Sequence, residues 1–138
     1  MLTASIYALF VVLGVSSTLF GLILADVTET LGISLANAGL VTTLFAVGRT
    51  AGSFLTGIAT DRWGVNRPTA INLFVMLGGL ALVTAAGHVA AFFLGSFIMG
   101  LAFGGLDVTL NLAITVLYPD RRAAMLSLLH AFYGVGSF

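Results

Sequence analysis

Long apolar runs alternate with short polar segments along the whole chain, and within the runs apolar and polar residues do not alternate. A helix needs about 20 apolar residues to cross a bilayer, and four runs come close to or exceed this length. They predict membrane spans at about 6–25, 36–59, 68–86 and 89–118. A fifth run, 123–138, would reach only about 24 Å as a helix, short of the roughly 30 Å hydrocarbon core.

The polar segments predict where the chain turns between spans. The predicted connectors are 26–34, which carries Asp26, Glu29 and Thr30, then 57–68, 87–88 and 119–122. Ser34 is placed to cap the second helix, and Pro68 suits the opening of the third.

Composition supports the membrane prediction, because 59% of the 138 residues are hydrophobic and only 7% are charged. Soluble domains have about 25% charged residues. In lipid only helices and closed barrels satisfy the backbone, and runs without alternation favour helices. We therefore predict an all-α polytopic membrane protein, with four transmembrane helices plus a truncated fifth, that contacts the lipid bilayer.

Several functions are disfavoured by residues that the sequence lacks. Without cysteine there is neither a disulfide nor a thiolate metal site, and no histidine or glutamate stands at metal-ligand spacing. The formal net charge of zero gives no general attraction to nucleic acid. Because catalytic and nucleotide-binding motifs are also missing, we expect neither an enzyme nor a bound cofactor or metal.

The arginines predict the orientation in the membrane. Arg62 and Arg67 fall in the second connector, Arg121 and Arg122 fall in the fourth, and the first and third connectors contain no arginine or lysine. By the positive-inside rule, the arginine-bearing connectors face the cytoplasm. We expect a multi-pass protein of the plasma or inner membrane with a cytoplasmic N-terminus.

A polar stripe runs along the fourth predicted span. Its members recur at three- and four-residue steps and therefore share one helix face: Ser96, Gly100, Gly104, Asp107, Asn111 and Thr115. Close helix packing accounts for the glycines. It does not account for Asp107, because an ionised carboxylate in mid-membrane costs several kcal/mol unless it is paired or hydrated. We therefore favour a functional or cavity-lining role for Asp107.

The second span has a similar stripe, formed by Thr42, Ala46, Arg49, Ser53, Thr56 and Thr60. Arg49 keeps its charge and needs water, a carboxylate or a ligand anion. The second and fourth spans run in the same direction, with Arg49 and Asp107 at similar depth. A pair between them is a hypothesis, and both a static pair and a role in transport remain open.

The fifth run places Ser127, His130, Gly134 and Ser137 on one face. A lone histidine in an apolar helix is more often a packed residue than a proton carrier. His130 is nevertheless kept as a candidate for proton coupling or substrate contact.

The connector 57–68 carries a recognisable pattern, Gly57-x-x-x-Asp61-Arg62-x-Gly64 followed by Arg67. This resembles the cytoplasmic signature loop between the second and third helices of the major facilitator superfamily. The chain differs from the usual pattern at Trp63, Val65 and Asn66, where the last two replace basic residues. The resemblance implies that Gly57 packs closely against a helix of the second half. It also implies that Asp61 latches the outward-facing state.

A second resemblance involves 104–111, Tyr118-Pro119, Arg121-Arg122 and 128–136, which are similar to the fucose-permease-like, proton-coupled sugar branch. It implies that Asp107 takes part in proton coupling. Arg49 is not part of the family pattern, and our own hypothesis is that Arg49 and Asn111 tune Asp107 or touch a small-molecule substrate. Residues 1–138 would then be an incomplete N-terminal bundle, inactive without the C-terminal half of a twelve-helix transporter.

Three alternatives remain open. The same fold could export drugs or metabolites, or the chain could be a small four-helix transporter that works as a homodimer. The marked arginine asymmetry and the lack of a carboxylate in the first span argue against the homodimer. The third alternative is a truncated product without activity.

Overall fold

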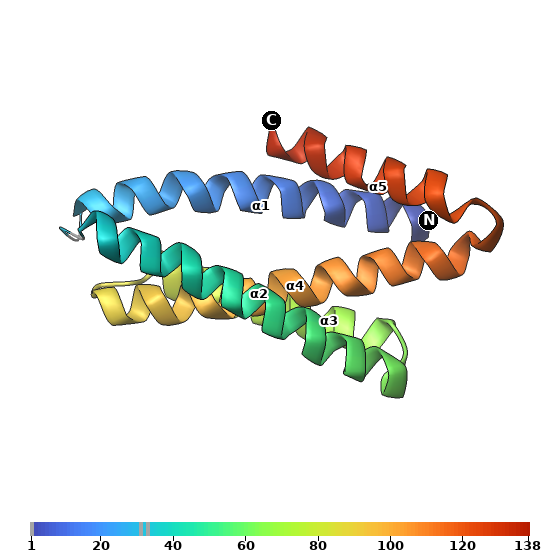
Figure 1. Ribbon diagram of the computed structural model, residues 1–138, viewed down its shortest axis with the longest axis horizontal. Coiled ribbons are helices and arrows are strands. Elements are labelled where there is room, and N and C mark those ends of the chain that lie inside the picture. The colour runs from blue at the N-terminus through green and yellow to red at the C-terminus, as the bar shows by residue number, and fades with distance from the viewer. Residues whose placement is uncertain (1, 31, 33) are drawn as a thin grey trace. The chain divides into compact units, whose positions relative to one another are not determined.

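The structure, a computed structural model, describes residues 2–30, 32 and 34–138, and its regular secondary structure is helical throughout that part. The elements are α1 Leu2–Thr30, α2 Leu35–Trp63, α3 Asn66–Thr84, α4 Val89–Leu117, the 3-10 helix η1 Pro119–Arg121 and α5 Arg122–Ser137 (Figure 1). Helices α1 to α4 are long and apolar enough to cross a membrane. The prediction of four spans plus a shorter fifth helix is confirmed.

Two predicted connectors are largely helical. Asp26, Glu29 and Thr30, predicted to lie in the polar connector after the first span, belong to α1, which continues through Thr30. Likewise 57–68 is not one turn, since α2 reaches Trp63 and α3 begins at Asn66. The physical reason is that a helix need not end where the hydrocarbon ends. A helix of 29 residues, the length of α1 and α2, is about 43 Å long and can extend into water.

The helix ends follow local chemistry. The hydroxyl oxygen of Ser34 accepts a hydrogen bond from the backbone N–H of Asn37 at 3.4 Å, which confirms the predicted cap. Gly64 ends α2 with φ +71°, a conformation that favours glycine, and its N–H donates to the carbonyl of Thr60 at 3.0 Å. The reversal between α2 and α3 therefore needs only Gly64 and Val65.

The chain divides into two compact units. The terminal unit consists of the residues up to Ala25 together with Leu110–Phe138, and the central unit is Asp26–Thr109. The central unit contains α2, α3 and most of α4. The terminal unit contains most of α1, the end of α4, η1 and α5.

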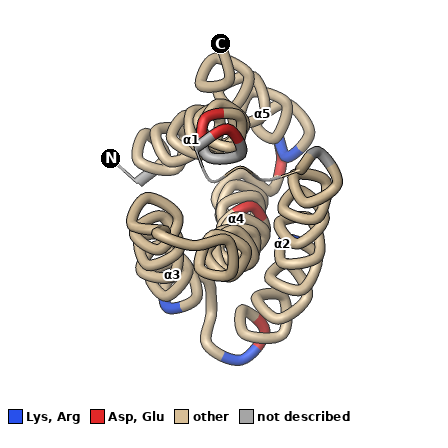
Figure 2. Tube along the Cα trace, turned by 90° about the vertical axis from the view of Figure 1, so that its left-hand side faces the viewer, with Lys and Arg blue, Asp and Glu red and all other residues tan. Residues whose placement is uncertain are grey.

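In the central unit α4 packs against both α2 and α3, and Figure 2 shows it between them. Its inward positions recur every three to four residues, and the fully or nearly buried ones are Phe92, Ser96, Met99, Ala102, Phe103, Leu106 and Thr109. The outward positions of α2 and α3 are apolar as well. Phe54 is 70% exposed and Phe74 is 74% exposed. Such large apolar side chains suit contact with lipid.

In the terminal unit α1 and α5 lie side by side (Figure 1). A Cβ atom at Gly14 would overlap the carbonyl oxygen of Tyr133, so the two backbones touch there. The rings of Tyr7 and Phe132 stack at 5.0 Å, and Thr18 donates to the carbonyl of Ser137 at 3.0 Å. The contact combines close backbone approach, aromatic stacking and one interhelical hydrogen bond.

Candidate functional site

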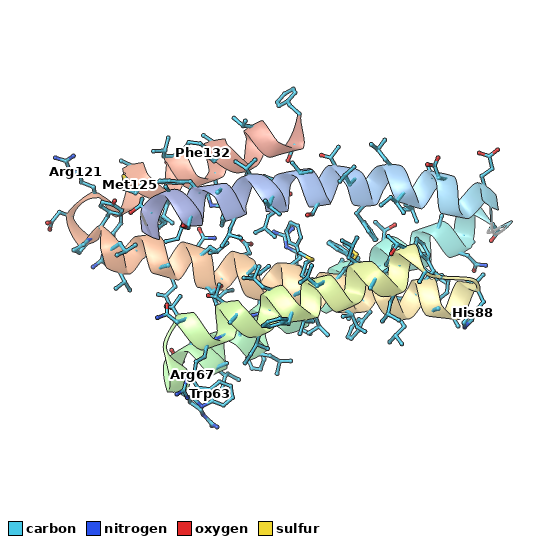
Figure 3. The ribbon with its side chains drawn as sticks, turned by 180° about the vertical axis from the view of Figure 1, so that it is seen from behind. Trp63, Arg67, His88, Arg121, Met125 and Phe132 are labelled. Atoms are coloured by element: carbon cyan, nitrogen blue, oxygen red, sulfur yellow. The ribbon has the colours of Figure 1, made fainter. Side chains whose placement is uncertain are left out.

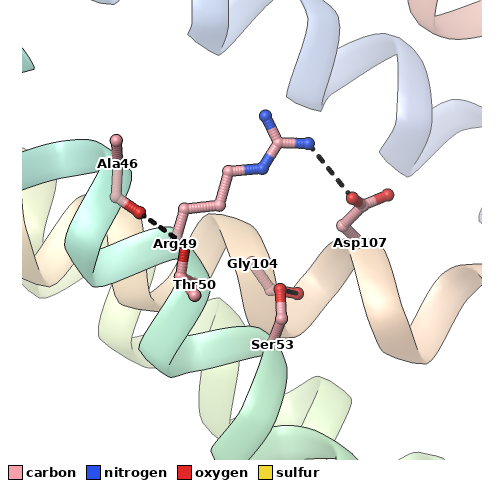
Figure 4. A network of polar contacts seen from close by, with 6 residues as sticks. All are labelled: Ala46, Arg49, Thr50, Ser53, Gly104 and Asp107. Atoms are coloured by element: carbon pink, nitrogen blue, oxygen red, sulfur yellow. Dashed lines mark hydrogen bonds and ion pairs between the residues drawn. The ribbon is translucent and has the colours of Figure 1, made fainter.

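Arg49 on α2 and Asp107 on α4 form an ion pair within the central unit. Nη2 of Arg49 lies 3.2 Å from Oδ2 of Asp107 (Figure 4). Arg49 lies at the middle of the candidate span Ala36–Trp63, and Asp107 lies past the middle of Val89–Leu117. The pair that the sequence left as a hypothesis is therefore present, and it lies deep in the apolar length of both helices.

The backbone of Arg49 is seated between two glycines of α4. A Cβ atom at Gly104 would overlap the carbonyl oxygen of Arg49, and one at Gly100 would lie 3.1 Å from its backbone nitrogen. Ser53 adds a hydrogen bond to the carbonyl of Gly104 at 3.2 Å. These contacts set the spacing of α2 and α4 independently of the charges, and the spacing brings the guanidinium within reach of Asp107.

Phe103 forms one wall of the site. The guanidinium carbon of Arg49 lies 5.0 Å from the centre of the Phe103 ring, within the range of a cation–π interaction. Phe45 meets Phe103 edge-on at 5.7 Å and buttresses it. Sequence reasoning missed Phe103, because it is one of 11 phenylalanines and nothing in its spacing marks it.

The ion pair is not fully buried within the central unit. The side chain of Arg49 is 48% exposed and that of Asp107 is 29% exposed. The guanidinium donates to the carboxylate through Nη2. A partly exposed pair can exchange one partner for water or a ligand at lower cost than a fully buried pair.

Asn111 and His130 lie in the terminal unit. Asn111 follows Asp107 by about one turn of α4 and is partly exposed. Its backbone carbonyl accepts a hydrogen bond from the hydroxyl of Thr115 at 2.8 Å. His130 is exposed on α5 and meets the ring of Phe10 edge-on at 5.6 Å. The candidates for proton coupling or substrate contact are Arg49, Asp107, Asn111 and His130. Of these, the structure joins Arg49 with Asp107, and His130 belongs to the contact between α1 and α5.

The signature residues lie at the end of the central unit where α2 turns into α3. Asp61, Arg62, Gly64 and Arg67 are all exposed, and Asp61 makes no ion pair within the described central unit. A Cβ atom at Gly57 would meet nothing within 4 Å. Packing inside this unit therefore explains neither the small size of Gly57 nor the carboxylate of Asp61.

A buried polar contact near this end ties α2, α3 and α4 together. Asn72 donates to the hydroxyl of Thr56 at 3.1 Å and to the carbonyl of Pro68 at 2.9 Å. The side chain of Asn72 lies against Gly105, where a Cβ atom would overlap it. The contact satisfies two buried polar groups and needs no ligand. In the described part of the chain no group of three His, Cys, Asp or Glu could hold a metal.

Residues 6–138 match the profile of the Major Facilitator Superfamily, and the chain belongs to this family. With its four apolar spanning helices it is a multi-pass membrane protein. The family consists of transporters, which agrees with the expectation that the chain is not an enzyme.

Individual relatives are transporters too. The chain is 30% identical over 92 residues to a candidate niacin/nicotinamide transporter of Bacillus subtilis, covering 66% of the chain and 23% of the relative. It is 26% identical to sodium-dependent glucose transporter 1A of Mus musculus, covering 96% of the chain and 31% of the relative. It is 28% identical to sodium-dependent glucose transporter 1 of Rattus norvegicus, covering 99% of the chain and 28% of the relative. The chain thus spans less than a third of the length of these relatives. No solved structure matches it.

Proposed function

We propose that this chain forms the N-terminal membrane bundle of a solute transporter, completed by helices outside the chain, and that the Arg49–Asp107 pair couples transport to an ion. Alternating access by the rocking of two bundles around a midplane site is the mechanism that the family implies. The observation that carries the proposal is an ion pair at mid-depth between two apolar helices.

The pair is poorly explained as a device for holding helices together. A charged side chain near the bilayer centre costs about 2.5–3.5 kcal/mol on insertion scales. Replacing even a fully buried ion pair by apolar residues is often neutral or stabilising, and this pair is only partly buried. Here the glycine contacts already join α2 to α4. A costly pair in a contact that does not need it supports a functional role.

Protonation of Asp107 would be the coupling step. In the charged state the carboxylate holds the guanidinium of Arg49. A neutral carboxyl releases it, so the pair has two states that differ in charge arrangement. If each state favours a different orientation of the two bundles, uptake of the coupling ion shifts the population between them. Asn111 would contribute amide hydrogen bonds to the solute, and His130 is a second candidate for the proton path.

We propose a sugar as the solute. The two glucose transporters match nearly the whole chain, and the narrower resemblance points to the same class. Proton coupling rests on that resemblance, whereas the names of the two glucose transporters specify sodium. An aromatic acid such as niacin is the second candidate, favoured by the relative of 30% identity and by a guanidinium that binds carboxylates.

The signature segment would form a cytoplasmic latch against the helices outside this chain. The open space at Gly57 and the absence of an ion pair at Asp61 within the central unit support a partner there. Arg62 and Arg67 support a cytoplasmic position for the turn and the N-terminus. The plasma or inner membrane is the proposed location.

The test is uptake of labelled glucose and of labelled niacin into vesicles that hold the complete transporter. A proton gradient and a sodium gradient are imposed separately. Asp107→Asn removes the carboxylate while keeping the shape of the side chain, and accumulation should fall to the equilibrium level. The matched control is Asp120→Asn in the exposed helix η1, which should leave accumulation unchanged. Undiminished accumulation by the Asp107 variant contradicts the coupling role, and uptake of neither solute contradicts the substrate proposal.

A further inference from the structure

An apolar groove opens on the surface of the central unit between α2 and α3. It has a volume of about 250 Å³, and its walls include Leu55, Ala59 and Trp63 of α2, Ile71 and Val75 of α3, and Leu101 of α4. Leu55 is 57% exposed, Trp63 54% and Ile71 50%. We call this surface the α2–α3 groove.

The polar groups that touch the groove are already satisfied. The hydroxyl of Thr56 and the amide of Asn72 are hydrogen-bonded to each other at 3.1 Å, and both residues are buried. A polar solute would find few free donors or acceptors there. The groove therefore suits a hydrocarbon chain.

The length of the groove matches one leaflet of a bilayer. On α2 it extends from Gly52 to Trp63, which is about 16 Å at about 1.5 Å per residue. Half of the roughly 30 Å hydrocarbon core is about 15 Å. Arg49 lies at the middle of the candidate span Ala36–Trp63, so the groove, which begins at Gly52, occupies the half of this span that ends at Trp63.

The end of the groove at the turn between α2 and α3 carries basic residues. Arg62 precedes the groove residue Trp63, and Arg67 precedes the groove residue Pro68. Both arginines are exposed, and Figure 3 shows Arg67 beside Trp63 where α2 turns into α3. Asp61 lies about 200° around the helix from Trp63, so its side chain points away from the groove.

We infer that the α2–α3 groove binds one acyl chain of an anionic phospholipid, with the phosphate held by Arg62 and Arg67. Charge complementarity selects the occupant, because a basic end on an apolar groove at the membrane surface matches an anionic headgroup on its chain. The indole of Trp63 lies at the level of the headgroups, where tryptophan is enriched.

The groove lies on a different side of α2 from Gly57 and Asp61, the two residues that support the proposed latch. Gly57 and Asp61 are one turn apart, and they do not share the helix side of Ala59 and Trp63. A lipid chain in the groove would not cover Gly57 and Asp61, although Arg62 and Arg67 belong to the same signature segment. The inference therefore does not depend on the proposed transport activity.

Trp63 is the single tryptophan of the chain, so its fluorescence reports on this site alone. The chain is reconstituted in phosphatidylcholine vesicles that contain a small fraction of lipid with brominated acyl chains, which quench tryptophan on contact. The brominated lipid is phosphatidylglycerol in one arm and phosphatidylcholine in the other. We expect about tenfold preferential quenching by phosphatidylglycerol, since each arginine near an anionic surface adds to the attraction.

Two variants test the two ends of the site. Arg62→Gln with Arg67→Gln should abolish the preference for phosphatidylglycerol. Ala59→Phe fills the groove and should reduce quenching by phosphatidylglycerol, whereas Ala81→Phe on an exposed part of α3 should not. Soluble glycerol phosphate should not displace the lipid. Equal quenching by both lipids, displacement by glycerol phosphate, or a Trp63 that neither lipid reaches would overturn the inference.

Discussion

The contact of α2 with α4 and the contact of α1 with α5 use the same backbone packing but carry different side chains. In both, a glycine of one helix lies against a carbonyl oxygen of the other, Gly104 against Arg49 and Gly14 against Tyr133. The α2–α4 contact also holds an ion pair. The described α1–α5 contact holds stacked rings and no ion pair. Close approach of two helices in this protein therefore does not require charge.

This comparison indicates that the glycine contacts hold the helices together and that the ion pair has a different role. If the ion pair were the main cohesive element, α1 and α5 would need an equivalent. Because they approach as closely without one, the glycine contacts are sufficient in both places. Arg49 and Asp107 are then available for a changing interaction.

The largest expected effect comes from adding a methyl group where backbones touch. Gly104→Ala and Gly14→Ala should each destabilise the folded state by about 1–3 kcal/mol, because the new Cβ overlaps a carbonyl oxygen. The control is Gly78→Ala, where a Cβ meets nothing within 4 Å and helix propensity favours alanine. Unfolding of the micelle-bound protein in denaturant measures all three. Stability unchanged by Gly104→Ala would show that α2 and α4 are not held by this contact.

The next largest effect comes from removing the charges that only the α2–α4 contact contains. Asp107→Asn should cost about 2 kcal/mol, because it leaves Arg49 unpaired within an apolar span. Adding Arg49→Gln to that variant should restore most of the lost stability, since no unpaired charge remains. The same unfolding titration gives the coupling between the two positions. A double variant that is no more stable than Asp107→Asn alone would mean that the pair is chiefly cohesive.

Loss of an aromatic contact should reduce stability by a similar amount in the two helix contacts, and by less than the loss of the charge on Asp107. Phe103→Leu removes the face against Arg49 and the edge contact with Phe45, and Phe132→Leu removes the stack on Tyr7. We expect each to cost about 1 kcal/mol. Only Phe103→Leu should also change solute uptake, because only that ring contacts the charged site. Equal effects on uptake would contradict the separation of the two regions.

The smallest effect concerns single hydrogen bonds between helices. Ser53→Ala removes the bond to Gly104, and Thr18→Val removes the bond to Ser137. Interhelical hydrogen bonds in membranes average about 0.6 kcal/mol. Both variants should fall near this value in the unfolding titration. A loss several times larger would indicate that these hydroxyls, and not the glycines, set the helix spacing.

The sequence predicted the helices well because their cause is local. Each apolar run is long enough to span the membrane, and backbone hydrogen bonds in lipid are satisfied within a helix. The ends were predicted less well, since Asp26, Glu29 and Asp61 are polar yet helical. Polarity marks where the hydrocarbon ends, whereas the turn at Gly64 and the cap at Ser34 mark where the helix ends.

The site was predictable only as far as charge in an apolar run is conspicuous. Arg49 and Asp107 are conspicuous for this reason, but their pairing depends on which helices are neighbours. Spacing along the chain does not determine neighbours. Phe103 was missed for the same reason, because its role comes from the partner helix and not from its own sequence context.

The most direct test of the account is to measure stability and uptake on the same preparation of the Arg49→Gln and Asp107→Asn double variant. The account predicts a transporter that folds with nearly the original stability and no longer accumulates solute against its gradient. Full accumulation by that double variant would contradict the claim that this pair couples transport to an ion.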